Sequence, residues 1–357
     1  MNRNSLIILA AITLTMVVTA VVVVSEERSP TSMSNEKLLP MLSENINNAT
    51  AITIGSNRYR TELERDGDTW RIANSDGYPA LFDKVRSLLI NLTELRTKER
   101  KTDNPELYHY LDVQETDVRD SNSTRVTVRN SDGEVLADVL LGKARKSKVT
   151  GLQTGLYVRK PDAEHALLVE GQAPVSAKKT DWFNTDTINV SSDRVHEVIV
   201  KHPDGSRVRA YRDSPEGNFE LDNLPADRRI QSRVALNKFG SVLQQLAARD
   251  IRALDQFDFG GDAVETRVQT YDGLVVNVKS TEIDGDHYAN FQVRHDESLR
   301  MDFASTVTDS EGNKIEVAKQ AEALQRRLSN WVYQIPGFKY DVLSATLDDY
   351  TRRVKTD

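Results

Sequence analysis

The sequence predicts an α+β protein in which an N-terminal transmembrane helix is followed by two similar units, each a helix packed on a twisted antiparallel sheet, plus C-terminal helices. Three observations lead to this prediction: an uncharged apolar N-terminal stretch, an order of strands, helix and strands that occurs twice, and repeated Asp-Gly pairs. The chain has 357 residues, of which 38% are hydrophobic and 28% charged. These proportions are typical of a globular protein with a substantial core.

The first element is an apolar run from Ser5 to Val24 that contains no charged residue. A helix needs about 20 such residues to cross the hydrocarbon core of a bilayer. The apolar region of a cleaved signal peptide is shorter and ends in a small-x-small site, whereas this run continues past Thr19-Ala20-Val21. We therefore expect a transmembrane anchor over residues 5–24, preceded by a cytoplasmic N-terminus of residues 1–4.

The charges around this span predict its orientation. Arg3 and the amino terminus precede it, and Glu26-Glu27-Arg28 follow it. Acidic residues count little in the positive-inside rule, so the N-terminus is expected inside. Residues 25–35 are polar and contain Pro and Ser, as is typical of a tether. The bulk of the chain is then expected to be periplasmic or otherwise extracytoplasmic, on a single-pass protein of a bacterial inner membrane.

The first α+β unit is expected over residues 36–190. A short helix from Lys37 to Ile46 precedes strands marked by alternating apolar residues between Ala51 and Ile72. Asp83 to Thr97 has its apolar residues on one helical face: Val85, Leu88, Leu89, Leu92 and Leu95. Two further strand segments follow, over 124–142 and 155–171.

The second unit is expected over residues 191–357, where the same order recurs. Hairpin strands from Val195 to Leu221 precede an expected helix from Asn237 to Arg249, and two more strand segments end near His295. The elements stay in register when the following are aligned: Trp70 with Phe219, Pro79-Ala80 with Pro225-Ala226, Thr124-Arg125-Val126 with Thr266-Arg267-Val268, and Tyr157-Val158-Arg159 with Gln292-Val293-Arg294. We interpret this as an internal repeat. Helices are expected from Glu316 to Tyr333 and over a final segment carrying Tyr340 to Tyr350.

Six Asp-Gly pairs punctuate these segments, beginning at Asp66, Asp76, Asp132, Asp204, Asp272 and Asp284. Asp-Gly between alternating segments indicates a hairpin, because both central residues of a type I′ turn need positive φ.

Composition excludes several function classes. The net charge of -7 and the pI near 5.6 argue against a nucleic-acid partner, since such proteins concentrate Lys and Arg to neutralise phosphates. The chain has no cysteine, which excludes disulfides, thiolate metal sites and cysteine nucleophiles. No His-Glu-x-x-His or Gly-x-Ser-x-Gly pattern occurs, and no catalytic residue, metal ligand or cofactor is predicted.

Two places are candidates for contact with a ligand or partner. Lys143, Arg145, Lys146 and Lys148 precede a glycine-bearing turn, where they would face an anionic headgroup, a glycan phosphate or an acidic protein; the alternative is a solvated hairpin tip. Trp182 would be an exposed ligand platform or, alternatively, a packed aromatic residue. Asp255, Asp258 and Asp262 near a double glycine lack EF-hand spacing and are interpreted as an acidic loop rather than a calcium site.

Several segments together resemble the domain-of-unknown-function family numbered 4340. They are the stretch from Tyr78 to Val113 and, in order, Tyr-Pro-Ala, Leu-Leu-Gly-Lys, Tyr-Val-Arg and Asp-Trp, which begin at positions 78, 140, 157 and 181. The resemblance implies a bacterial membrane-anchored accessory protein, often encoded beside an ABC-2 type permease with its ATPase and a gliding-motility-like extracytoplasmic protein. The family has no established catalytic residues to carry over.

These observations predict a non-catalytic extracytoplasmic accessory or scaffold subunit of an ABC-type membrane transport complex. One alternative is an envelope glycan- or lipid-binding module that uses the Lys143 to Lys148 turn and Trp182. The other is a hydrolase with a dispersed carboxylate site, which 54 acidic residues leave open.

Overall fold

The computed structural model describes residues 35–147, 149–302, 314 and 316–354. The expected anchor over residues 5–24 and the tether up to residue 34 lie outside the described residues. Among the residues that are described, no helix combines the length and the apolar character needed to cross a membrane.

The chain divides into two compact units. The first comprises the described residues up to Thr50 together with 54–58 and 87–175, and the second comprises 51–53, 59–86 and 176 onwards. This division differs from the expected boundary between residues 190 and 191, because the segments 59–86 and 176–190 group with the second compact unit.

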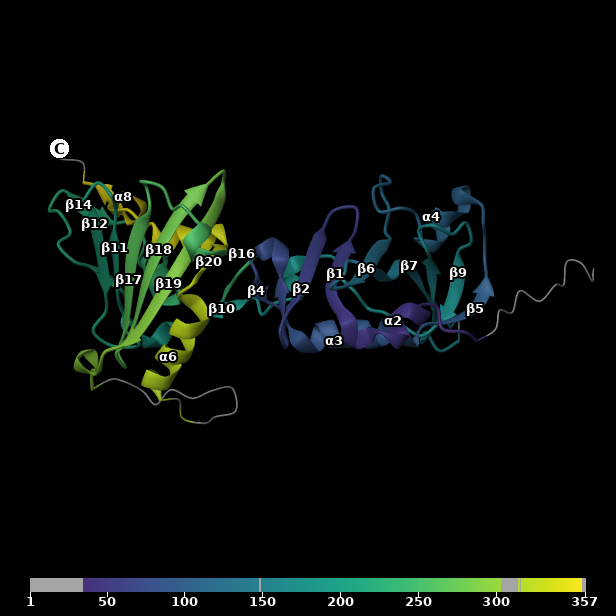
Figure 1. The fold of residues 1–357 in the computed structure, drawn as a ribbon. Coiled ribbons are helices and arrows are strands. Elements are labelled where there is room, and N and C mark those ends of the chain that lie inside the picture. The colour runs from purple at the N-terminus through teal and green to yellow at the C-terminus, as the bar shows by residue number, and fades with distance from the viewer. Residues whose placement is uncertain (1–34, 148, 303–313, 315, 355–357) are drawn as a thin grey trace, which may run out of the picture. The chain divides into compact units, whose positions relative to one another are not determined.

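Mixed helix and antiparallel sheet make the protein α+β. Nine strands form one sheet in the order β4-β3-β2-β1-β6-β7-β8-β9-β5. Their bounds are β1 Ala49–Gly55, β2 Arg60–Asp66, β3 Thr69–Ile72, β4 Tyr78–Pro79, β5 Arg96–Arg100, β6 Thr124–Asn130, β7 Val135–Lys146, β8 Gln153–Arg159 and β9 Leu167–Glu170. Helices α2 (Pro40–Glu44) and α3 (Phe82–Glu94) lie along one side of these strands (Figure 1). The predicted apolar stripe of α3 is buried, with Val85 and Leu92 fully inaccessible.

The second compact unit contains an eight-stranded antiparallel sheet in the order β13-β12-β11-β17-β18-β19-β20-β16. Its strands are β11 Val195–Lys201, β12 Arg207–Tyr211, β13 Glu220–Leu221, β16 Asp250–Ala253, β17 Val264–Thr270, β18 Leu274–Ile283, β19 Asp286–His295 and β20 Trp331–Ile335. Two small ladders pair β10 (Asp186–Ile188) with β15 (Leu246–Ala247) and β14 (Arg228–Ile230) with β21 (Thr351–Arg353). The helices are α5 Arg233–Leu236, α6 Val317–Leu328, α7 Gly337–Leu343 and α8 Leu347–Tyr350.

The strand order of the first sheet recurs in the second. The run β3-β2-β1-β6-β7-β8-β9-β5 corresponds, strand by strand, to β13-β12-β11-β17-β18-β19-β20-β16. The aligned triplets at Thr124 and Thr266 lie on the equivalent strands β6 and β17, and those at Tyr157 and Gln292 lie on β8 and β19. The predicted repeat of strand order is therefore confirmed, despite the low residue identity between the copies.

The prediction of a helix from Asn237 to Arg249 is wrong. α5 ends at Leu236, before this range, and within it only a 3-10 segment over Asn237–Ser241 is helical; Gln245 has a left-handed φ of 48°. A Cβ atom on Gly240 would come within 2.6 Å of the Ser192 hydroxyl oxygen, so close packing requires glycine inside the expected helix.

Four other helix predictions were too long, and the first is that of Lys37 to Ile46, where α2 covers only Pro40–Glu44. The helix expected up to Thr97 ends at Glu94, and the helix expected up to Tyr333 ends at Leu328, because the following residues form β5 and β20. The single final helix is instead two short ones, α7 and α8. In each case the apolar spacing was compatible with a helix, but pairing with a distant strand or a tertiary break determined where it ends.

All six Asp-Gly pairs lie in turns between antiparallel strands, as predicted. Both residues have positive φ only at Asp76-Gly77 and Asp284-Gly285, where φ is 52° and 78°, and 54° and 83°. At the other four turns glycine alone is left-handed, which does not match a type I′ turn.

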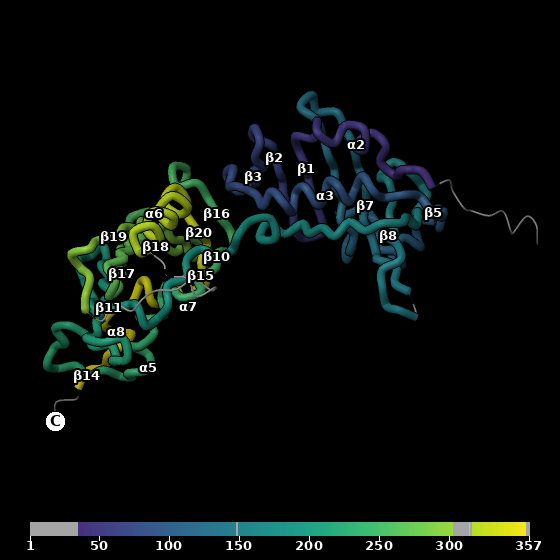
Figure 2. The backbone as a smooth tube through the Cα atoms, turned by 90° about the horizontal axis from the view of Figure 1, so that it is seen from below, coloured from purple at the N-terminus to yellow at the C-terminus, as the bar shows by residue number. Residues whose placement is uncertain are grey.

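The eight-stranded sheet buries one face against the C-terminal helices. Val198, Val268 and Val276 occupy adjacent positions on β11, β17 and β18 and are all fully buried. The Thr266 hydroxyl on this face donates a hydrogen bond to the Leu343 carbonyl oxygen of α7. α6 lies beside β19 (Figures 1 and 2). The opposite face carries the site described next.

Candidate functional site

Strand register places two rows of mostly polar side chains on one face of the eight-stranded sheet. The first row, across β12, β11, β17, β18 and β19, is Arg207, Lys201, Glu265, Lys279 and Asn290. The second row is Arg209, Ile199, Arg267, Asn277 and Gln292. Directly opposed residues of antiparallel strands point to the same side, so both rows share one surface. We call these ten residues the basic face.

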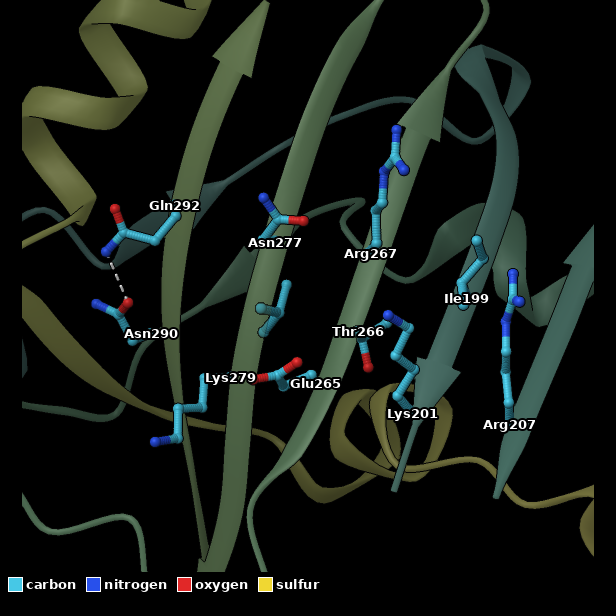
Figure 3. Close-up of a pocket in the computed structure, with 11 residues that line it drawn as sticks. Ile199, Lys201, Arg207, Glu265, Thr266, Arg267, Asn277, Lys279, Asn290 and Gln292 are labelled. Carbon is cyan, nitrogen blue, oxygen red and sulfur yellow. Dashed lines mark hydrogen bonds between the residues drawn. The ribbon is translucent and has the colours of Figure 1, made fainter. Parts of the chain in front are cut away.

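A pocket of about 460 Å³ lies over the basic face. All of its residues except Arg209 line this pocket. Figure 3 shows that they stand on neighbouring strands, with Arg267 above the level of Lys201 and Glu265 and with Gln292 and Asn290 at one border.

The pocket is positively charged although the chain is acidic. Its lining carries four cationic side chains, Lys201, Arg207, Arg267 and Lys279, and a single carboxylate, Glu265. The protein as a whole has a net charge of -7. Within the described part of the chain, no ion pair joins Lys201, Arg207 or Lys279 to a carboxylate. Protein carboxylates therefore do not neutralise these three cations, and the pocket attracts anions.

Arg209 and Arg267 are two arginines of the same row in opposite situations. Arg209 Nε lies 2.5 Å from Glu197 and its Nη1 lies 3.2 Å from Asp222. Burial works to lower the pKa of Arg209, but the hydrogen bonds and charges of these two carboxylates raise it above its ordinary value. Arg209 is thus a paired, structural cation.

Arg267 is only partly paired. One of its terminal nitrogens donates to Gln269 at 3.4 Å, whereas its buried Nε has no hydrogen-bond partner among the described residues. A buried donor without a partner costs free energy that the protein recovers only if something else accepts the hydrogen bond. Because Nε itself is inaccessible, the donors of Arg267 available to a bound group are the N–H groups of its terminal nitrogens, in the lining of the pocket.

An amide network fixes the border of the pocket next to α6. Gln325 of α6 donates to Gln292 at 2.8 Å, and Gln292 donates to Asn290 at 2.9 Å. Asn290 in turn donates to the carbonyl oxygens of Ser329 and Trp331 at 2.9 and 2.8 Å. β20 pairs with β19 only as far as Asn290, and beyond that point Gln325 accepts a hydrogen bond from the Val293 backbone. α6 thereby closes the free edge of β19.

The residues singled out from the sequence lie elsewhere. Lys143, Arg145 and Lys146 occupy the exposed end of β7 in the first compact unit, and Lys148 lies outside the described residues. Trp182 belongs to the second compact unit and is 4% exposed, with its indole N–H donating to Ser176. Trp182 is packed in the core, so in this structure it presents no platform to a ligand.

The acidic loop shows no metal site. Asp255, Asp258 and Asp262 are exposed, and Asp258 accepts a hydrogen bond from the Gly260 backbone. Among the described residues, no group of three or more His, Cys, Asp or Glu side chains is arranged to hold a metal ion.

Sequence reasoning did not identify the basic face. Its signal is the alternation of polar and apolar residues in β17 and β18, which by itself indicates only a solvated side of a strand. The concentration of charge appears once five strands, separated by up to 93 positions along the chain, are placed in register.

The repeated strand order defines a class of α+β protein with two related sheets. The model of the family described as "Domain of unknown function (DUF4340)" matches residues 70–271, and the chain belongs to this family. The match includes β11, β12 and β17 of the basic face and ends before β18. No curated protein matches the chain, and no solved structure matches it.

Proposed function

We propose that the protein is a non-catalytic accessory or scaffold subunit of an ABC-type membrane transport complex, held at the bacterial inner membrane by its N-terminal span. The resemblance described above suggests an ABC-2 type permease and a gliding-motility-like extracytoplasmic protein as partners. The observation that carries the proposal is the basic face, an open, positively charged sheet surface on an otherwise acidic protein. In this role the basic face binds an acidic surface of a partner protein.

The dimensions of the basic face suit a protein partner. Strands lie about 4.8 Å apart, so five strands span roughly 20 Å, the scale of a segment of a protein interface. Complementary charge accelerates encounter and selects against wrong partners, and arginine is enriched at such interfaces. The amide network beside α6 gives this surface a fixed border.

A hydrolase is less well supported at this place. Glycoside hydrolysis uses two carboxyl groups flanking the scissile bond. The pocket over the basic face is lined by one carboxylate, Glu265, whose cross-strand neighbours are Lys201 and Lys279. This set of side chains favours binding of an anion over acid-base chemistry.

The test is affinity purification of the solubilised full-length protein from its native membrane, followed by mass spectrometry. The wild type is compared with Lys201→Glu/Arg207→Glu and with the control Arg233→Glu/Lys238→Glu, which reverses two exposed charges elsewhere in the same unit. We expect a permease, its ATPase or an extracytoplasmic partner with the wild type and the control. The variant of the basic face should recover at least about tenfold less of the partner it binds directly, and high salt should mimic this loss.

Recovery of the protein alone, even after crosslinking, would refute the accessory role. Equal recovery by both charge-reversed variants would place the partner on another surface. Substitutions of exposed side chains rarely change stability by more than about 0.5 kcal/mol, so both variants should fold normally. Their tryptophan fluorescence, compared with that of the wild type, checks this.

A further inference from the structure

The β7–β8 hairpin ends in a turn that exposes apolar side chains. Ser147 and Leu152 are joined by a backbone hydrogen bond of 2.8 Å, and Gly151 donates to Ser147 at 2.9 Å. Val149 is 94% exposed and Leu152 is 69% exposed. Figure 2 shows this hairpin extending away from the body of its unit. The two side chains thus form an apolar point rather than part of a covered surface.

The strand behind this point is basic. Lys143, Arg145 and Lys146 are all exposed, and no ion pair involves them in the part of the chain that the structure describes. Arg145 lies opposite Gly155 and Lys146 lies opposite Gln153, so the neighbouring strand supplies no acidic partner. An apolar tip followed by unpaired cations is the pattern by which peripheral segments enter the headgroup region of anionic membranes.

Singly exposed apolar residues on a protein surface are normal and need no explanation. Here two of them share one protruding turn, next to three exposed cations. A protein partner that recognises a site specifically buries roughly 800 Å² on each side, which a single turn does not provide. A bilayer interface accepts a pointed apolar tip without shape complementarity, and its phosphates match the cations.

We infer that the tip of the β7–β8 hairpin docks on an anionic lipid surface, with Val149 and Leu152 entering the headgroup region and Lys143, Arg145 and Lys146 against lipid phosphates. This inference goes beyond the proposed function and uses a different unit from the basic face. The proposed anchor supports it, because residues 25–35 would keep the first described residues within about 35 Å of the membrane. Those first residues belong to the first compact unit, where the backbone of Lys37 forms an isolated antiparallel β-bridge with that of Arg96.

The absence of native cysteine allows a site-specific test. The full-length chain carrying Leu152→Cys, labelled with an environment-sensitive dye, is reconstituted with vesicles of phosphatidylcholine alone or mixed with phosphatidylglycerol. A dye at Asp132→Cys, in the exposed β6–β7 turn of the same unit, is the matched control. We expect a blue shift and quenching by lipid-attached quenchers at position 152 with the anionic vesicles only, and neither at position 132.

The charged side chains are tested by Lys143→Glu/Arg145→Glu/Lys146→Glu in the Leu152→Cys background. Docking should weaken by about 100-fold, because each basic residue at an anionic surface contributes a factor of about five. A dye response that is independent of lipid charge, or unchanged in the triple variant, would overturn the inference. So would a response that requires an added acidic protein. Flotation of the chain with vesicles measures separately whether the N-terminal anchor inserts into the bilayer. A wrong membrane location and a hairpin tip that does not dock therefore give different results.

Discussion

Arg194 and Asp272 form an ion pair inside the second compact unit, with Arg194 Nε 2.8 Å from Asp272 Oδ2 and side chains that are 6% and 5% exposed. Arg194 also donates to Gln320 of α6 at 3.0 Å, and Asp272 accepts a hydrogen bond from the Thr270 hydroxyl. The pair therefore joins the start of β11, the β17–β18 turn and α6, which are the elements that support the basic face.

Replacing Arg194 by Met should strongly destabilise the second unit, because Asp272 would remain buried without its counter-charge. Breaking a buried pair in this way typically costs about 3–5 kcal/mol, whereas removing both charges together costs less. The double variant Arg194→Met/Asp272→Asn should therefore recover part of the loss. Urea unfolding monitored by tryptophan fluorescence measures this, since Trp70, Trp182 and Trp331 all belong to the second unit.

The control is the exposed pair Lys319–Glu316, whose side chains are 76% and 64% exposed at 2.9 Å. Lys319→Met should change the free energy of unfolding by less than about 1 kcal/mol. An equally small effect of Arg194→Met would mean that water or backbone rearrangement satisfies Asp272, and the supporting role of the pair would be wrong.

Gly142 in β7 should not tolerate a side chain. A Cβ atom there would come within 2.3 Å of the Leu111 carbonyl oxygen and 2.7 Å of the Asp112 carbonyl oxygen. Both neighbours are backbone atoms, so Gly142→Ala should destabilise the first unit by about 1–3 kcal/mol or more through overpacking. Gly55→Ala is the control, because a Cβ at Gly55 would meet no atom within 4 Å. Hydrogen exchange of β7 and β8 amides compares the two, and equal protection in both variants would contradict the prediction.

The fold was predictable where local pattern and tertiary structure agree. The stripe of α3 and the Asp-Gly turns depend on residues a few positions apart, and both appear in the structure. The segment 237–249 has helical apolar spacing as well, but Gly240 packs against Ser192, and the Gln245 backbone donates to the Asn189 side chain at 2.9 Å. Contacts with residues about 50 positions away thus override the local pattern.

The basic face was not predictable for a related reason. Lys201, Glu265 and Lys279 are neighbours only because β11 pairs with β17 and β17 with β18 in one particular register. A shift by one residue would turn each side chain to the opposite face. The sequence indicates that each strand has a polar side, but not which polar residues become neighbours.

Lys339 provides a pH-dependent test of the packing of α7. Lys339 is 7% exposed, and its ammonium group donates hydrogen bonds to the carbonyl oxygens of Ser241 and Gln244, the latter at 2.6 Å. Burial lowers the pKa of Lys339 below its ordinary value of 10.5. The folded protein therefore releases this proton at a lower pH than the unfolded chain does. Between the lowered pKa and 10.5 the unfolded state binds more protons, so stability rises with pH in that interval.

Lys339→Met removes the titrating group, so the stability of the wild type should rise relative to this variant as the pH increases from the lowered pKa of Lys339 toward 10.5. Lys339→Arg, which keeps a charge at every pH, should instead remain destabilised across this interval. Urea midpoints from tryptophan fluorescence give the comparison, in which the ionisation of tyrosines is common to all three proteins. A difference between wild type and Lys339→Met that does not change with pH would show that Lys339 titrates normally in the fold.

Substitutions of Arg267 and Arg209 should affect different properties of the basic face, the first partner binding and the second stability. Arg267→Met removes a guanidinium whose buried Nε has no hydrogen-bond partner among the residues that the structure describes, so the second unit should keep its stability or gain up to about 1 kcal/mol. Arg209→Met leaves Glu197, which is 9% exposed, without its cation and should destabilise the same unit by about 1–3 kcal/mol.

Partner recovery should respond in the opposite order. Arg267→Met should reduce the recovery of an acidic partner although the protein is at least as stable, because one of the four cationic side chains that line the pocket is then missing. Arg209→Met, when assayed under conditions where it is folded, should retain most of the recovery. If Arg267→Met lowered stability as much as Arg209→Met and left recovery unchanged, Arg267 would be a structural residue. A surface that keeps an arginine at a cost in stability is expected where that arginine is used for binding.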